Sequence, residues 1–195
     1  MIGKTMVCMM AGAMFSMFGC SAEDRAPAAK VTAEPGRILI AYYSYSGNTR
    51  FAAEQIQKAT GGELFEIKPV TPYPADYDAC VSQAKKEIGA GFKPALAEKI
   101  KDPARYDVIF VGTPNWWSTM APPVLTFLTE NDLAGKTVIP FVTHGGGGMA
   151  RCETDMRKAV PKAEFGKGGA FSGGSIRRSG DAITGWVNET VTVRK

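Results

Sequence analysis

A short segment rich in hydroxyl groups has the residue types that hold a phosphate. It lies between an apolar run at 38–43 and an amphipathic stretch at 51–59, an order that predicts a strand, a tight turn and a helix start. Such a turn directs backbone N–H groups and hydroxyls at one point, where the helix N-terminus favours an anion. A plain helix cap at Ser46 or Asn48, with Gly47 in the turn, is the alternative. The segment consists of Ser44, Tyr45, Ser46, Gly47, Asn48 and Thr49.

Two adjacent tryptophans in a second loop are suited to covering a flat ligand. Because their segment follows an apolar run at 108–111, we expect at least one indole to stack on a planar ring, a contact worth about 0.5–1.5 kcal/mol beyond burial. The alternative is that both pack on the helix that follows. Trp186 lies at core spacing with Ile183, and we expect it to be structural. The loop begins Thr113, Pro114, Asn115, Trp116, Trp117.

A third loop joins the only histidine of the chain to four consecutive glycines. It follows an apolar run at 138–142 and begins Thr143, His144, Gly145, Gly146. Glycine runs cost chain entropy, so the fold is expected to need bare backbone there, open to the polar edge of a ligand. A flexible connection is the alternative. His144 is able to donate to an anionic ligand or carry a proton near neutral pH, or it only closes the turn.

The strands that must position these loops are apolar at every residue, as strands covered on both faces are. We predict them at 38–43, 108–111 and 138–142, with a shorter strand at 63–68. A fifth is expected within 163–171, where glycines weaken the pattern.

Helical stretches alternate with these strands, which predicts an α/β domain with an open parallel sheet and helices on both faces. Ligands of such sheets bind at the carboxyl ends of the strands, where the three loops would meet. This convergence favours the phosphate-binding interpretation over the helix cap. The helices are predicted at 49–60, 77–90, 121–131 and 180–192.

The N-terminal segment predicts export and a membrane tether. A positively charged start precedes an uncharged apolar run at 5–17 that is too short to span as a mature helix, so 1–19 is predicted to be a signal peptide. Residues 17–21 resemble a bacterial lipobox, which would place lipid on Cys20; an ordinary secreted chain cut nearby is the alternative. Residues 20–36 are predicted to be a flexible linker to a domain at 37–195, working outside the cytoplasm as a membrane-anchored lipoprotein, or secreted or periplasmic if not lipidated.

Charge and cysteine content narrow the partners further. The formal net charge of +4 is small, and the sequence contains no block of basic residues. Both observations argue against nucleic acid as a partner. A single histidine without clustered cysteines or carboxylates argues against a metal site. Cys80 and Cys152 would remain in the domain, where an oxidising compartment permits a disulfide, or they stay as two separate thiols.

Together, the three loops resemble those of the flavodoxin family, over about residues 37–192. The first matches the phosphate-loop form T/S-x-T/S-G-x-T, and Gly112–Trp117 with Pro122 and Pro123 is similar to the second signature. The resemblance implies a doubly wound, five-stranded parallel sheet with strand order 2-1-3-4-5. It also implies FMN as cofactor, with the isoalloxazine ring between the tryptophan and glycine loops and the phosphate on Ser44, Ser46, Gly47, Asn48 and Thr49.

Three functions fit the resemblance. The leading one is an FMN-bound electron-transfer protein without catalytic side chains, exchanging electrons with a redox partner protein or reductase at a membrane or outside the cytoplasm. The second is an NAD(P)H-dependent flavin reductase acting on a quinone or other small acceptor; no G-x-G-x-x-G motif follows a strand, although flavodoxin-like reductases do not need one. The third is a flavin-free, lipid-anchored binding module.

Overall fold

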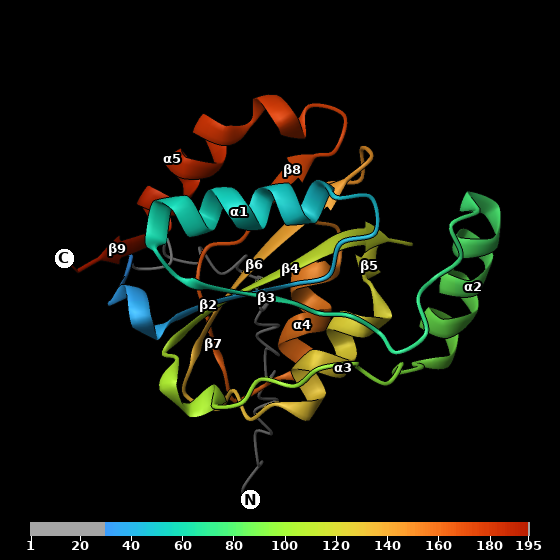
Figure 1. Ribbon diagram of the computed structural model, residues 1–195, viewed down its shortest axis with the longest axis horizontal. Coiled ribbons are helices and arrows are strands. Elements are labelled where there is room, and N and C mark those ends of the chain that lie inside the picture. The colour runs from blue at the N-terminus through green and yellow to red at the C-terminus, as the bar shows by residue number, and fades with distance from the viewer. Residues whose placement is uncertain (1–29, 195) are drawn as a thin grey trace, which may run out of the picture.

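A computed structural model describes residues 30–194, and in it one parallel sheet forms the centre of the domain (Figure 1). The strand order is β3-β2-β4-β6-β7, and β8 also pairs with β6. When these five parallel strands are numbered by their order in the chain, the order across the sheet is 2-1-3-4-5. The predicted fold class and strand order are therefore confirmed. The strands are β2 (Ile38–Tyr42), β3 (Glu63–Glu66), β4 (Val108–Trp116), β6 (Thr137–His144), β7 (Glu164–Phe165) and β8 (Gly169–Ser172).

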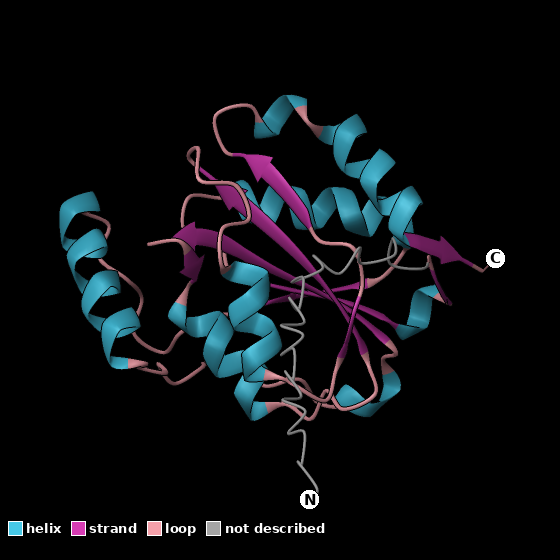
Figure 2. Cartoon of the chain, turned by 180° about the vertical axis from the view of Figure 1, so that it is seen from behind, coloured by secondary structure: helices cyan, strands magenta, loops and turns pink. Residues whose placement is uncertain are grey.

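Helices cover both faces of the sheet, as predicted. Apolar residues of α1 and α5 pack on one face, and those of α2, α3 and α4 pack on the other. Figure 1 shows α2 at the side of the molecule, beyond α3 and α4, and Figure 2 shows the strands crossing between the two helical layers. The helices are α1 (Asn48–Thr60), α2 (Tyr77–Ala90), α3 (Pro122–Glu130), α4 (Cys152–Ala159) and α5 (Gly180–Thr190), with short 3-10 turns at Pro35–Arg37, Pro103–Arg105 and Ile176–Arg178.

Strand pairing in the described residues begins before residue 37, although the sequence predicts a flexible linker as far as residue 36. Strand β1 (Val31–Ala33) pairs in parallel with β9 (Val191–Val193). The helix α5 ends at Thr190 and not at 192, because the next three residues form β9. These residues, Val191, Thr192 and Val193, are β-branched and favour a strand. The predicted signal peptide and Cys20 lie outside the described residues. Within residues 30–194, no helix combines the length and apolar character that crossing a bilayer requires.

The central strands are buried on both faces, which explains their continuous apolar runs. Every residue of β2 is buried. Leu39 faces the core beneath α2, α3 and α4, whereas its neighbours Ile38 and Ile40 face the core beneath α1 and α5. Alternate residues of one strand thus serve two cores, and the register of the sheet is fixed by both.

Two strands extend further than the apolar runs indicate. β4 pairs with β6 as far as Pro114 opposite Thr143, and β4 then continues to Trp116 and returns as β5 (Thr119–Met120). The segment expected to be an irregular loop at 113–119 is therefore a strand end and a hairpin. Backbone pairing contributes to this extension, since ladder hydrogen bonds do not require apolar side chains.

At Gly112 on β4 there is no room for a side chain. A Cβ atom there would collide with the aromatic ring of Phe141 on β6. The ring of Phe141 therefore lies against the backbone of β4 shortly before the tryptophan segment.

Replacing Gly112 with alanine is expected to lower the free energy of unfolding by about 1–3 kcal/mol, because the added methyl group displaces the buried ring of Phe141. Gly89→Ala is the matched control: open space surrounds this helical glycine, so alanine should raise stability by about 0.5–1 kcal/mol. Urea unfolding of both variants provides the measurement. Equal stability of Gly112→Ala and the parent protein would contradict the described packing.

Candidate functional site

The three loops singled out by the sequence meet at the carboxyl edge of the sheet. The first and third are joined by a hydrogen bond between the hydroxyls of Thr49 and Thr143, 2.8 Å apart. The second and third are joined by the side-chain amide of Asn115, which donates to the carbonyl oxygen of Gly148 at 2.9 Å. The first and second meet where the rings of Tyr45 and Trp116 lie edge to face. Each loop therefore contacts the other two.

The first loop leaves the start of α1 open. Gly47, in the left-handed conformation with φ of +83°, is the N-cap, and no side chain of the cap residue bonds to the first turn. The alternative that Ser46 or Asn48 caps the helix is therefore wrong. Ser44 accepts the backbone N–H of Arg50 through its hydroxyl oxygen at 3.1 Å and retains its own proton for donation. With only the N–H of Arg50 satisfied by a side chain, the first turn of α1 beside donor hydroxyls is an anion-binding arrangement.

Three threonines of the predicted site are buried and point into the protein. Thr49 is only 1% exposed, and its hydroxyl is engaged with Thr143. The hydroxyl oxygen of Thr113 accepts the N–H of Ala121 and the group donates to the carbonyl of Pro114. These side chains hold the loops in place.

The tryptophan segment ends in a strained two-residue turn. Trp117 and Ser118 have φ values of +51° and +66°, the left-handed region that a tight hairpin requires at both central residues and that glycine or asparagine usually fills. Compensating contacts hold it: the Trp117 indole N–H donates to the carbonyl of Val81, and the Ser118 carbonyl accepts the N–H of Arg151. Strain of this kind is stored at functional sites.

The two indoles have different surroundings. Trp116 makes edge-to-face contacts with Tyr43, Tyr45 and Tyr73, with ring centroids 4.9–5.8 Å apart. Trp117 is 47% exposed. The ammonium group of Lys85 lies over its ring, 4.8 Å from the centroid. Trp117 is thus the indole with free surface, while Trp116 is fixed by the protein.

An apolar slot of about 270 Å³ opens between the hairpin, the first loop and α2. Sequence reasoning missed the contribution of α2, since no spacing links residues 77–84 to a tryptophan more than thirty positions away. The glycine loop lies outside this slot and contacts the hairpin through Asn115. The lining residues are Tyr45, Tyr77, Cys80, Val81, Ala84, Asn115, Trp116 and Trp117.

The glycine loop needs bare backbone, as the sequence predicts. Gly146 and Gly148 have φ values of +142° and +61°. Beside them, the Nδ1 atom of His144 accepts the N–H of Gly146 at 3.0 Å, so this ring closes the turn. Because Nδ1 is the acceptor, the neutral ring carries its proton on Nε2.

Both cysteines of the described domain are buried free thiols. Burial raises the pKa of the Cys152 thiol to about 12 and also raises the pKa of the Cys80 thiol. The disulfide considered from the sequence is not formed, and neither thiol is prepared for nucleophilic chemistry. Trp186 packs against Phe110 and Phe171, which confirms its structural role.

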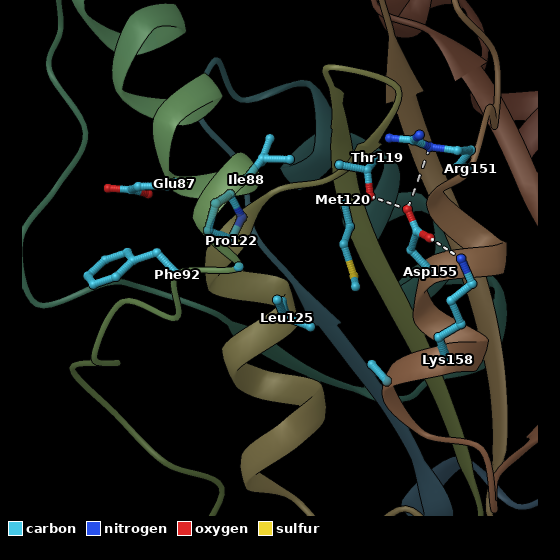
Figure 3. A pocket seen from close by; sticks show the side chains of 12 residues that line it. Glu87, Ile88, Phe92, Thr119, Met120, Pro122, Leu125, Arg151, Asp155 and Lys158 are labelled. Atoms are coloured by element: carbon cyan, nitrogen blue, oxygen red, sulfur yellow. Dashed lines mark hydrogen bonds and ion pairs between the residues drawn. The ribbon is translucent and has the colours of Figure 1, made fainter.

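A second, larger cleft of about 460 Å³ adjoins the hairpin on the side of β5 (Figure 3). Its floor is apolar, with Met120 and Leu125 at its base. At one wall, Asp155 accepts a hydrogen bond from Thr119 and pairs with Arg151 and Lys158. Two cations thus share one carboxylate at this wall.

Comparison with known proteins identifies the family. The flavodoxin family model matches residues 37–190. A proposed flavoprotein from Bacteroides eggerthii is 34% identical, with a TM-score of 0.65 over 75% of this chain and 97% of that one. One from Bacteroides uniformis is 33% identical, with a TM-score of 0.71 over 80% and 99%. A Lactobacillus acidophilus flavoprotein solved in complex with FMN is 25% identical, with a TM-score of 0.62 over 77% and 98%. The search of curated proteins finds no match.

Thr49→Val is expected to lower the free energy of unfolding by about 1–3 kcal/mol, because it leaves the buried Thr143 hydroxyl without a partner. The double variant Thr49→Val/Thr143→Val should lose clearly less than the sum of the two single variants, since both polar groups are then removed. Urea unfolding of the three variants gives the coupling energy. Strictly additive losses would show that the two hydroxyls do not stabilise each other.

Proposed function

Because the chain belongs to the flavodoxin family, we propose that it binds FMN at the three joined loops and acts as an electron-transfer protein. The observation that carries this proposal is the open N-terminus of α1 at Gly47, placed beside the aromatic hairpin and the glycine loop. FMN, when bound, supplies the redox chemistry. The protein supplies binding, orientation and electrostatics.

Each loop contacts a different part of the cofactor, according to the chemistry of its residues. The backbone N–H groups at the start of α1, with the hydroxyls of Ser44 and Ser46, bind the phosphate. The hairpin holds the flat ring system, with Trp117 as the indole that has free surface. The bare backbone of the glycine loop, shaped by the bond between His144 and Gly146, faces the polar edge of the ring.

An electron carrier fits this arrangement because the loops contain no nucleophile or general base aligned for covalent chemistry. Electron exchange needs only that a partner reach the cofactor, and the exposed hairpin residue Trp117 lies at the surface. We propose a redox partner protein or reductase in the same extracytoplasmic or membrane-associated location.

A second candidate function is an NAD(P)H-dependent flavin reductase. The observation that favours it is the 460 Å³ cleft beside β5 (Figure 3), whose apolar floor has room for a quinone or a similar small acceptor. The two functions differ in what reduces the flavin: a protein partner in the first and NAD(P)H directly in the second.

Purified protein incubated with FMN should show the two visible absorption bands of oxidised flavin after gel filtration. Under anaerobic conditions, NAD(P)H alone should bleach these bands slowly, and addition of a flavin-linked reductase should accelerate the bleaching. Rapid bleaching by NAD(P)H without a reductase would support the second function. A colourless protein that takes up no FMN would contradict both and favour a flavin-free binding module.

We also propose that lipid on Cys20 tethers the domain to a membrane, which the charged start, apolar run and lipobox-like residues support. Cys20→Ser should move the protein from the membrane fraction to the soluble fraction and abolish metabolic labelling with a fatty acid. Cys8→Ser, within the predicted signal, is the control and should leave both unchanged. Membrane retention and labelling of Cys20→Ser would overturn the tether.

A further inference from the structure

A guanidinium group that none of the three sequence motifs contains lies against the phosphate loop. Arg177, in the 3-10 turn after β8, places its Nη2 atom 3.5 Å from the position that a Cβ on Gly47 would occupy. The same guanidinium stands 4.9 Å from the centroid of the Phe51 ring in the first turn of α1. Arg177 is thus held beside the open N-terminus of the helix.

This cation has no anionic partner within residues 30–194. Ion pairs in that part of the chain involve other lysines and arginines, and Arg177 belongs to none of them. An arginine placed over an aromatic ring and beside free N–H donors, but without a carboxylate, increases the positive potential at that point.

The turn that carries Arg177 is firmly anchored. Ile176 is 1% exposed in the core beneath α1 and α5. The N–H of Gly173 donates to the carbonyl of His144 at 2.8 Å, and Gly173 lies so close to Asn48 that a Cβ there would approach the Asn48 amide to 2.7 Å. The segment therefore packs against both the third loop and the start of α1.

We propose that Arg177 binds the phosphate of the cofactor and makes the site selective for FMN over riboflavin, which lacks the phosphate. This inference rests on the proposed FMN binding. The planar guanidinium presents several N–H donors to phosphate oxygens, and charge-assisted contacts of this kind are stronger than those of neutral donors. The guanidinium lies in van der Waals range of the position of a Cβ on Gly47, so it stands on the phosphate-loop side of the turn without crowding the loop.

Arg178 provides a matched control, because it is the next residue of the same turn, is also exposed and belongs to no ion pair within residues 30–194. The dissociation constants of FMN and riboflavin are measured by flavin fluorescence quenching on the full-length apoprotein in detergent. Arg177→Gln is expected to weaken FMN binding at least about tenfold and to leave riboflavin binding within about twofold. Arg178→Gln should change neither by more than about twofold.

Three further measurements separate a direct contact from a structural effect. FMN binding to the parent protein should weaken with added salt more steeply than FMN binding to Arg177→Gln, since one screened charge is then missing. Arg177→Lys, which keeps the charge but loses the planar donors, should fall between the parent and Arg177→Gln. Thermal unfolding of each apoprotein should be unchanged, because the side chain is exposed.

Equal FMN affinities for Arg177→Gln and Arg178→Gln would overturn the proposal while leaving FMN binding itself intact. Parallel weakening of FMN and riboflavin by Arg177→Gln would also overturn it, since the phosphate would then not be the group contacted. A parent protein that binds riboflavin but not FMN, or neither, would overturn both this inference and the proposed cofactor.

Discussion

The parallel pairing of β2, β4 and β6 is the constraint on which the rest of the molecule depends. These strands are buried on both faces, so their registers are fixed by two cores at once. With the registers fixed, the three chain segments that leave the carboxyl ends are brought to one edge. The contact between the Thr49 and Thr143 hydroxyls joins two of these segments at the point where the sheet ends. Site geometry is therefore a consequence of core packing.

Conformational strain is concentrated at that same edge. The turn at Trp117 and Ser118, the N-cap at Gly47, and the glycines at 146 and 148 all adopt positive φ. Ala150, shortly after the glycine loop, also has a positive φ, at +44°. The other positive φ values occur at glycines that end helices or close turns, such as Gly61 and Gly91. Cross-loop contacts, such as that between Ser118 and Arg151, compensate the strain at the hairpin. A surface that is bare of side chains yet rigid suits a cofactor that must be held closely by backbone groups.

The electrostatic character of the site follows from which charges are neutralised and which are not. In the cleft beside β5, Arg151 and Lys158 share the carboxylate of Asp155 as their partner. At the phosphate loop Arg177 has no carboxylate partner among the described residues, and the helix dipole adds to its field. Arg177 thus adds positive charge at the place where the proposed phosphate would bind, in a protein whose overall charge is only mildly positive.

Sequence alone determined the fold class, the strand order and the three loops, because two-sided burial leaves continuous apolar runs and because the flavodoxin motifs are short and local. It also placed four helices to within about two residues, apart from the overlap of α5 with β9. Only the tertiary structure decided the rest: the pairing of β1 with β9, the extension of β4 into a hairpin, the slot beneath α2 and the position of Arg177. These depend on backbone pairing and on contacts between residues far apart in the chain, for example Gly47 and Arg177, and no local pattern of residue types records such contacts.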